Sequence, residues 1–115
     1  MTNQEMVDRD IIKEQADTII AQLGGYRRLA MMTGAKNFVY GGTDNDEAYI
    51  QFRIGRNAKR INLVKITLNA DDTYAMEFMW ATVNAITVKA EFSGVYNDTL
   101  KKIFESTTGL YLSFR

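Results

Sequence analysis

Four consecutive segments between residues 48 and 92 alternate apolar and polar side chains. In the first segment, Ile50, Phe52 and Ile54 fall on one side of an extended chain, and polar residues fall on the other. A period of two is the pattern of a strand that shows one face to a core and the other to water. The four segments therefore predict an antiparallel meander. Its expected inward-facing residues are Ile50, Phe52, Ile54, Val64, Ile66, Leu68, Tyr74, Met76, Phe78, Trp80, Ile86, Val88, Ala90 and Phe92.

Helical periodicity flanks this meander on both sides. Residues 3–23 place apolar side chains three and four positions apart, and Gly24 and Gly25 follow as a stop, because glycine readily adopts the left-handed conformation that ends helices. A second amphipathic helix is predicted over about residues 97–108 and ends at Gly109. Each helix has one apolar side, so we expect both to pack against the meander.

Two further segments read as extended chain. Residues 26–33 are predicted as a strand, followed by a bend at Gly34 and a short extended piece at residues 38–40. Residues 110–114 alternate again, which predicts a final strand or an extended tail. The chain is thus predicted to form a single α+β domain over residues 1–115. In it, an N-terminal and a C-terminal helix pack on one face of a mainly antiparallel sheet of five to six strands.

Composition narrows the chemistry that this domain can perform. The 115 residues include no cysteine and no histidine, so thiol nucleophiles, disulfides and imidazole bases are excluded. We therefore predict a non-catalytic protein with no cofactor and no metal site. The polar, acidic beginning of the chain is unlike a secretory signal, and no apolar run approaches the roughly 20 residues of a membrane span. A soluble cytoplasmic protein without a membrane partner is expected.

Charge is balanced over the whole chain but not along it. Acidic and basic residues number 14 each, yet the bases concentrate in residues 27–65. The connection at residues 55–60 carries three of them, and the strands beside it carry more, so we predict one basic surface. Its candidate nucleic-acid-binding residues are Lys36, Arg53, Arg56, Lys59, Arg60 and Lys65.

Such a surface favours contact with a phosphate backbone, with the rings of Tyr40 and Tyr49 available for base stacking. The alternative is the solvated face of an ordinary sheet, where Lys and Arg also protect strand edges from aggregation. Trp80 is assigned to the core in either case, since it continues the apolar stripe that includes Phe78.

Several short motifs are shared with a known group of proteins. Residues 32–38 (MTGAKNF), 54–62 (IGRNAKRIN) and 64–68 (VKITL) resemble small, mostly uncharacterised proteins encoded by tailed phages and prophages. The resemblance covers roughly residues 25 to 115. It implies a phage origin and expression in the cytoplasm of a bacterial host, and it carries no activity with it.

Two functions follow as hypotheses. In the first, the protein is a small non-catalytic phage-type binding protein that contacts nucleic acid through the basic loop and sheet face. In the alternative, it is a protein–protein adaptor or inhibitor of a host or phage protein. That second role would use the outer sheet face or an edge strand, with a homodimer as one form of the same contact.

Overall fold

The computed structural model describes residues 3–112, with side chains from residue 9 onward. Three helices and five strands follow one another in the order α-α-β-β-β-β-β-α. This confirms the predicted α+β class. The elements are α1 (Asn3–Gln22), α2 (Tyr26–Thr33), β1 (Lys36–Gly42), β2 (Ala48–Arg53), β3 (Leu63–Leu68), β4 (Tyr74–Ala81), β5 (Ile86–Val95) and α3 (Leu100–Thr108).

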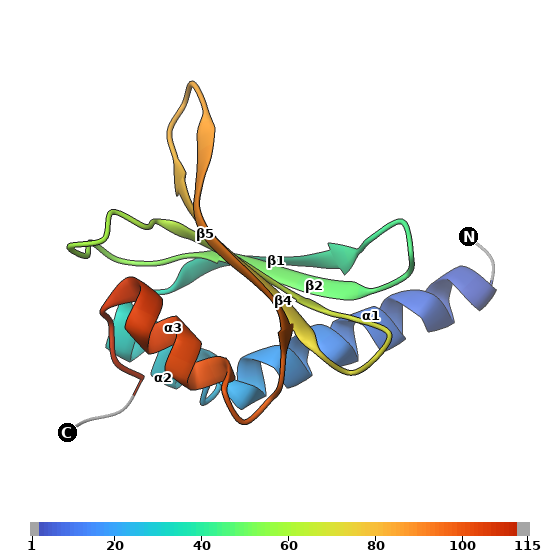
Figure 1. The fold of residues 1–115 in the computed structure, drawn as a ribbon. Helices are drawn as coiled ribbons and strands as arrows, with labels where there is room; N and C mark the ends of the chain where they lie inside the picture. The colour runs from blue at the N-terminus through green and yellow to red at the C-terminus, as the bar shows by residue number, and fades with distance from the viewer. Residues whose placement is uncertain (1–2, 113–115) are drawn as a thin grey trace.

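The five strands form one sheet in sequence order, and every neighbouring pair is antiparallel. Ile50 of β2 lies opposite Ile66 of β3, which in turn lies opposite Met76 of β4, so these apolar residues share one face. All three helices lie on that face (Figure 1). We call the other side, which faces away from the helices, the outer face.

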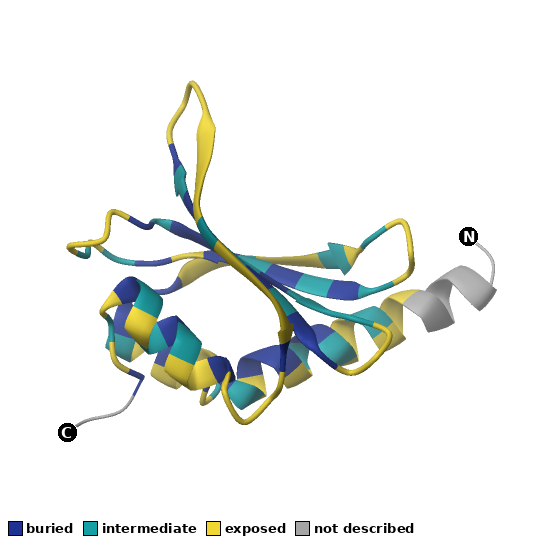
Figure 2. Ribbon diagram, viewed as in Figure 1, coloured by how far each residue is buried: buried dark blue, intermediate teal, exposed yellow. Residues whose placement is uncertain are grey.

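The core fills the space between the helices and the sheet, and the residues coloured as buried in Figure 2 line this space. Ile19 and Ile20 of α1 and Leu23 directly after it are fully buried, as the helical spacing predicts. A chain of aromatic rings crosses the core, with centroids 4.9 to 6.5 Å apart at successive contacts. Its members are Tyr26, Phe38, Phe52, Phe104, Phe78 and Phe92.

The predicted strand at residues 26–33 is wrong, because this segment forms helix α2. Only Leu29 and Thr33 are buried there, and their spacing of four residues is that of a helix. Arginine, leucine, alanine and methionine dominate the segment, and all are good helix formers. Gly34 ends the helix in the left-handed conformation, with a φ of 73° and its N–H donated to Ala30 O.

The C-terminal segment also differs from its prediction. Helix α3 begins at Leu100, after Thr99, and Gly109 ends it as expected. Residues 110–112 form no strand, and the rest of the predicted final strand, at 113–114, lies outside the described residues. The short extended piece predicted at residues 38–40 is instead the centre of a full strand, β1. The sheet therefore has five strands within the described part of the chain.

The last strand pair departs from the predicted inward-facing pattern. Ile86 and Val88 are 62% and 48% exposed, and Phe92 is 37% exposed. The pairing of β4 with β5 shifts register twice, once beside Phe78 and once beside Met76, and such bulges bend a strand. The β4–β5 hairpin consequently rises out of the sheet as an arm (Figure 1). Its tip carries Val83, which is fully exposed.

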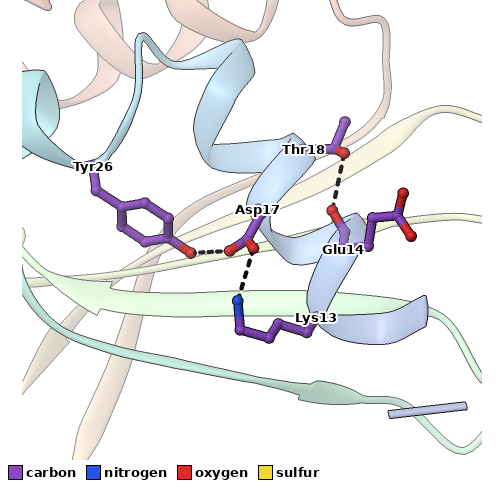
Figure 3. A network of polar contacts seen from close by, with 5 residues as sticks. All are labelled: Lys13, Glu14, Asp17, Thr18 and Tyr26. Atoms are coloured by element: carbon purple, nitrogen blue, oxygen red, sulfur yellow. Dashed lines mark hydrogen bonds and ion pairs between the residues drawn. The ribbon is translucent and has the colours of Figure 1, made fainter. Parts of the chain in front are cut away.

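A polar network joins the two N-terminal helices on the surface (Figure 3). Tyr26 Oη donates to Asp17 Oδ1 at 2.7 Å, and Lys13 Nζ donates to Asp17 Oδ2 at 3.0 Å. The hydrogen bonds from Tyr26 and Lys13 lower the pKa of Asp17. Burial, and then the hydrogen bond to Asp17, raise the pKa of Tyr26 above its ordinary value of 10.0.

Replacing Tyr26 with phenylalanine is expected to lower the free energy of unfolding by about 0.5–1 kcal/mol near neutral pH, since the lost hydrogen bond is exposed to solvent. The pKa of Tyr26 is higher in the folded than in the unfolded protein, so its protonated form stabilises the fold below the unfolded-state pKa. This stabilisation is lost as the pH rises from the unfolded-state pKa toward the folded-state pKa. Tyr26→Phe should therefore flatten the decline of stability above about pH 10. Urea titrations from pH 7 to 11 measure both effects. A Tyr96→Phe control changes an exposed ring and should match the parent protein, and an equal decline in Tyr26→Phe would contradict this role of Tyr26.

Candidate functional site

The connection between β2 and β3, residues 54–62, is a loop built around one asparagine. Asn57 Nδ2 donates to the carbonyl oxygens of Gly55 at 2.9 Å and Ile61 at 2.6 Å, and Ile61 N–H donates to Asn57 Oδ1 at 3.2 Å. The N–H of Arg60 donates to Asn57 O at 3.2 Å, and Arg60 takes a φ of 57° to close the turn. The side chain of Asn57 thus supplies the hydrogen bonds that a neighbouring strand would supply elsewhere.

A second asparagine ties the loop to the end of β4. Asn62 N–H donates to Met79 O at 3.0 Å, and its side-chain Nδ2 donates to Ala81 O at 2.8 Å. Ala81 N–H donates in return to Asn62 Oδ1 at 2.7 Å. These three hydrogen bonds hold the backbone of β4 on both sides of Trp80, and they thereby set the position of Trp80 relative to the loop.

The beginning of the loop is held against the turn after α2. Gly55 N–H donates to Thr33 O at 2.7 Å. A Cβ on Gly34 would lie 3.2 Å from the Gly55 Cα, so the two backbones approach as closely as two glycines allow. The segments MTGAKNF and IGRNAKRIN, distant in the sequence, therefore meet in the structure.

The six predicted basic residues gather at one end of the sheet. Lys36 and Arg53 are register partners on β1 and β2, and Lys65 lies on β3 opposite Gln51. Arg53 and Lys65 share the outer face with Tyr49, because they alternate with the helix-facing residues of β2 and β3. Lys36 shares this face as the register partner of Arg53. Arg56, Lys59 and Arg60 extend the same end outward on the loop and are exposed.

Few carboxylates lie near this end of the molecule to offset its positive charge. No acidic residue occurs from Ala48 to Ala70, a segment that carries five of the six cations. Within the described part of the chain, none of the six forms an ion pair. Glu77 lies across from Lys65 in the register and is the acidic residue of the neighbouring strand. The positive field of these cations is therefore not offset by an ion-paired carboxylate among the described residues.

Aromatic rings lie among these cations at two places. Lys65 Nζ lies 4.5 Å from the centroid of the Tyr49 ring on the outer face. The guanidinium carbon of Arg60 lies 5.1 Å from the centroid of the Trp80 ring. Both distances are those of cation–π contacts. Tyr40, the other ring expected here, instead shares the helix-facing side with Ile50.

The assignment of Trp80 to the core is corrected by this arrangement. Trp80 continues the face of β4 that holds Phe78, but it is not part of the core cluster and is only half-buried. The loop, rather than a helix, lies against it. The two form a groove of about 430 Å³, lined by Ile54, Gly55, Arg56, Asn57, Ala58, Arg60, Ile61, Asn62 and Trp80.

Sequence reasoning located the cations of this site but missed Trp80, Asn57 and Asn62. The two asparagines within residues 55–62 were an available signal, since asparagine side chains commonly bond to nearby backbone in turns. Nothing in the alternation of β4 distinguishes Trp80 from Phe78, because both fall on the same face. They differ in what packs against them, which is Phe104 of α3 for Phe78 and the β2–β3 loop for Trp80.

The fold and the site together define a small α+β protein with a five-stranded antiparallel meander and a cationic, ring-bearing groove at one end. No protein-family model, no curated protein and no solved structure matches this chain. Among the described residues, no group of three or more acidic side chains is placed to hold a metal ion. None of the described helices is both long and apolar enough to cross a membrane.

Proposed function

We propose that this chain is a small, non-catalytic nucleic-acid-binding protein of the phage-encoded kind that its motifs resemble. Its place of action would be the cytoplasm of the bacterial host. The proposed contact surface is the basic end of the sheet, made of Lys36, Arg53, Arg56, Lys59, Arg60 and Lys65. We refer to these six residues as the basic end.

One observation carries this proposal, namely that unpaired cations project from a loop whose backbone is already held in place. Arg56, Lys59 and Arg60 lie within a nine-residue connection that Asn57 and Asn62 tie down at both ends. Binding a phosphate backbone releases counterions, and that release supplies most of the affinity for polyanions. Because the loop is ordered beforehand, little backbone entropy is lost when it binds.

The proposal is tested by titrating the protein with labelled single- and double-stranded oligonucleotides at several salt concentrations. Binding should weaken linearly on a plot of log K against log salt. If all six cations contact phosphates, the slope for a single strand should approach about −4, since each contact contributes roughly −0.7. Absence of binding at low salt, or binding that salt does not affect, would contradict the proposal.

A second candidate function is favoured by the exposed apolar residues of β5 and its arm. Val83, Ile86 and Val88 lie in solvent on a two-stranded ribbon, and such ribbons are marginally stable alone. An adaptor that docks a host or phage protein, or a second copy of itself, on this edge would cover them. That function predicts complexes that persist at high salt, which light scattering of the protein alone and with infected-cell extract fractions would measure.

A further inference from the structure

The groove between Trp80 and the β2–β3 loop has the composition of a site for a flat, partly apolar ligand. Ile54 and Ile61 lie in it and are buried, and Trp80 forms one wall. Arg56 and Arg60 bring two positive charges to the same groove. A nucleobase combines apolar faces with a polar edge and is attached to a negative phosphate, so it matches each of these features.

The contact between Arg60 and Trp80 provides a ready stacking surface. The guanidinium group is planar, and it lies over the indole ring at a centroid distance of 5.1 Å. Arg60 is exposed, so the group is accessible from solvent as well. Bases stack on aromatic rings and also on guanidinium planes, so each partner of this contact offers a surface to a base.

The walls of the groove are held at a fixed separation. Asn62 bonds to the residues before and after Trp80, namely Met79 and Ala81. Asn57 closes the loop on the other wall through Gly55 and Ile61. A preformed site binds more tightly than one that must order on binding, since its own entropy is already lost.

Arg60 has its side chain at an unusual backbone position. Its φ of 57° is a left-handed conformation that glycine or asparagine adopts more readily. A long charged residue at this position directs a guanidinium across the loop toward Trp80. The same turn with glycine would be less strained but would leave the indole uncovered.

We propose that this groove holds one unpaired nucleobase of a single-stranded nucleic acid, stacked on the Arg60–Trp80 pair, while Arg56 neutralises the adjoining phosphate. The inference rests on the proposed function and adds its ligand class. Bases inside a duplex are stacked on each other and do not reach such a groove. A duplex therefore binds through its phosphates alone and should not quench the emission of Trp80.

Trp80 is the sole tryptophan of the chain, so its fluorescence reports directly on the groove. The full-length protein is titrated with a thymidine 12-mer, with a 12-mer of the same backbone that lacks bases, and with a 12-base-pair duplex. The thymidine 12-mer should bind at least about fivefold more tightly than the baseless strand, consistent with one stacked base. It should also quench the emission of Trp80, and the baseless strand should not.

Arg60→Lys is the matched variant, because lysine keeps the positive charge but lacks the planar guanidinium group on which a base could stack. The ratio of affinity for the thymidine 12-mer to affinity for the baseless strand should fall several-fold, because dividing by the baseless-strand affinity removes any change in the phosphate contact of Arg60. Trp80→Ala should reduce the preference for bases by about five- to 100-fold. Arg60 is exposed, so Arg60→Lys should fold normally and decides the question even if Trp80→Ala does not.

The outcomes separate this inference from the proposed function. Equal binding of both 12-mers, without quenching, would overturn base stacking and leave binding to polyanions intact. Failure of every strand to bind would overturn both. Replacing thymidine with uridine on a ribose backbone then distinguishes DNA from RNA as the source of the base.

Discussion

Reversing the charges of Arg56, Lys59 and Arg60 to glutamate is expected to abolish measurable binding to oligonucleotides. Three phosphate contacts are lost and three repulsive charges are added on the same loop. Removing the contacts alone should reduce the magnitude of the salt slope by about 2, at roughly 0.7 for each contact with a single strand. We expect the affinity at moderate salt to fall by at least about 100-fold. Fluorescence anisotropy of a labelled strand measures both quantities.

The control for this variant must change the net charge equally at another place. Arg27 of α2 and Lys101 and Lys102 of α3 are exposed and belong to the helix layer. Reversing these three to glutamate should alter affinity only through the long-range electrostatic field of the protein, which salt screens within about 10 Å at 0.1 M. Equal losses in the two variants would assign binding to net charge and would exclude the basic end as a specific site.

Replacing Phe104 with alanine is expected to cause the largest loss of stability among the changes considered. Phe104 is fully buried, and its ring lies 6.5 Å from that of Phe52 and 6.2 Å from that of Phe78. It thus joins α3 to two central strands. Truncating a buried phenylalanine costs about 3–5 kcal/mol through lost burial and the cavity left behind. This is a large part of the roughly 5–15 kcal/mol by which a domain is stable.

Urea denaturation followed by circular dichroism measures this loss. Lys102→Ala on the exposed side of the same helix provides the control, and it should change the free energy of unfolding by less than about 0.5 kcal/mol. A loss below about 1 kcal/mol for Phe104→Ala would mean that α3 contributes little to the core. The folded Phe104→Ala variant should keep its affinity for oligonucleotides, because α3 supplies no residue to the basic end.

The meander was predictable because its central strands bury most of their apolar residues on the helix-facing side. Strand β2 alternates in burial from Ala48 to Arg53, and β3 and β4 depart from this pattern where Leu63, Met79 and Ala81 form a small buried cluster on the outer face. The two terminal helices were predictable for the same reason, with a period of about 3.6 in place of 2. Local periodicity is sufficient wherever one face of an element meets the core and the other meets water.

Short elements and edges were less predictable. Residues 26–33 span only two helical turns, and a segment of that length fits a strand or a helix pattern equally well. The alternation in β5 is clear in the sequence, yet Ile86 and Val88 are exposed, because β5 is an edge strand bent by bulges. An apolar residue in an alternating run is buried only if another layer covers it.

The amino-acid sequence by itself determined the α+β class, the meander and the concentration of cations within residues 36–65. These properties depend on side-chain type and on spacing along the chain, which the sequence contains in full. The tertiary structure alone decided that Gly34 meets Gly55, that Trp80 leaves the core, and that Arg60 lies on its ring. Those facts depend on which segment packs against each residue and on how the loop closes across strands, and contacts between distant segments set both.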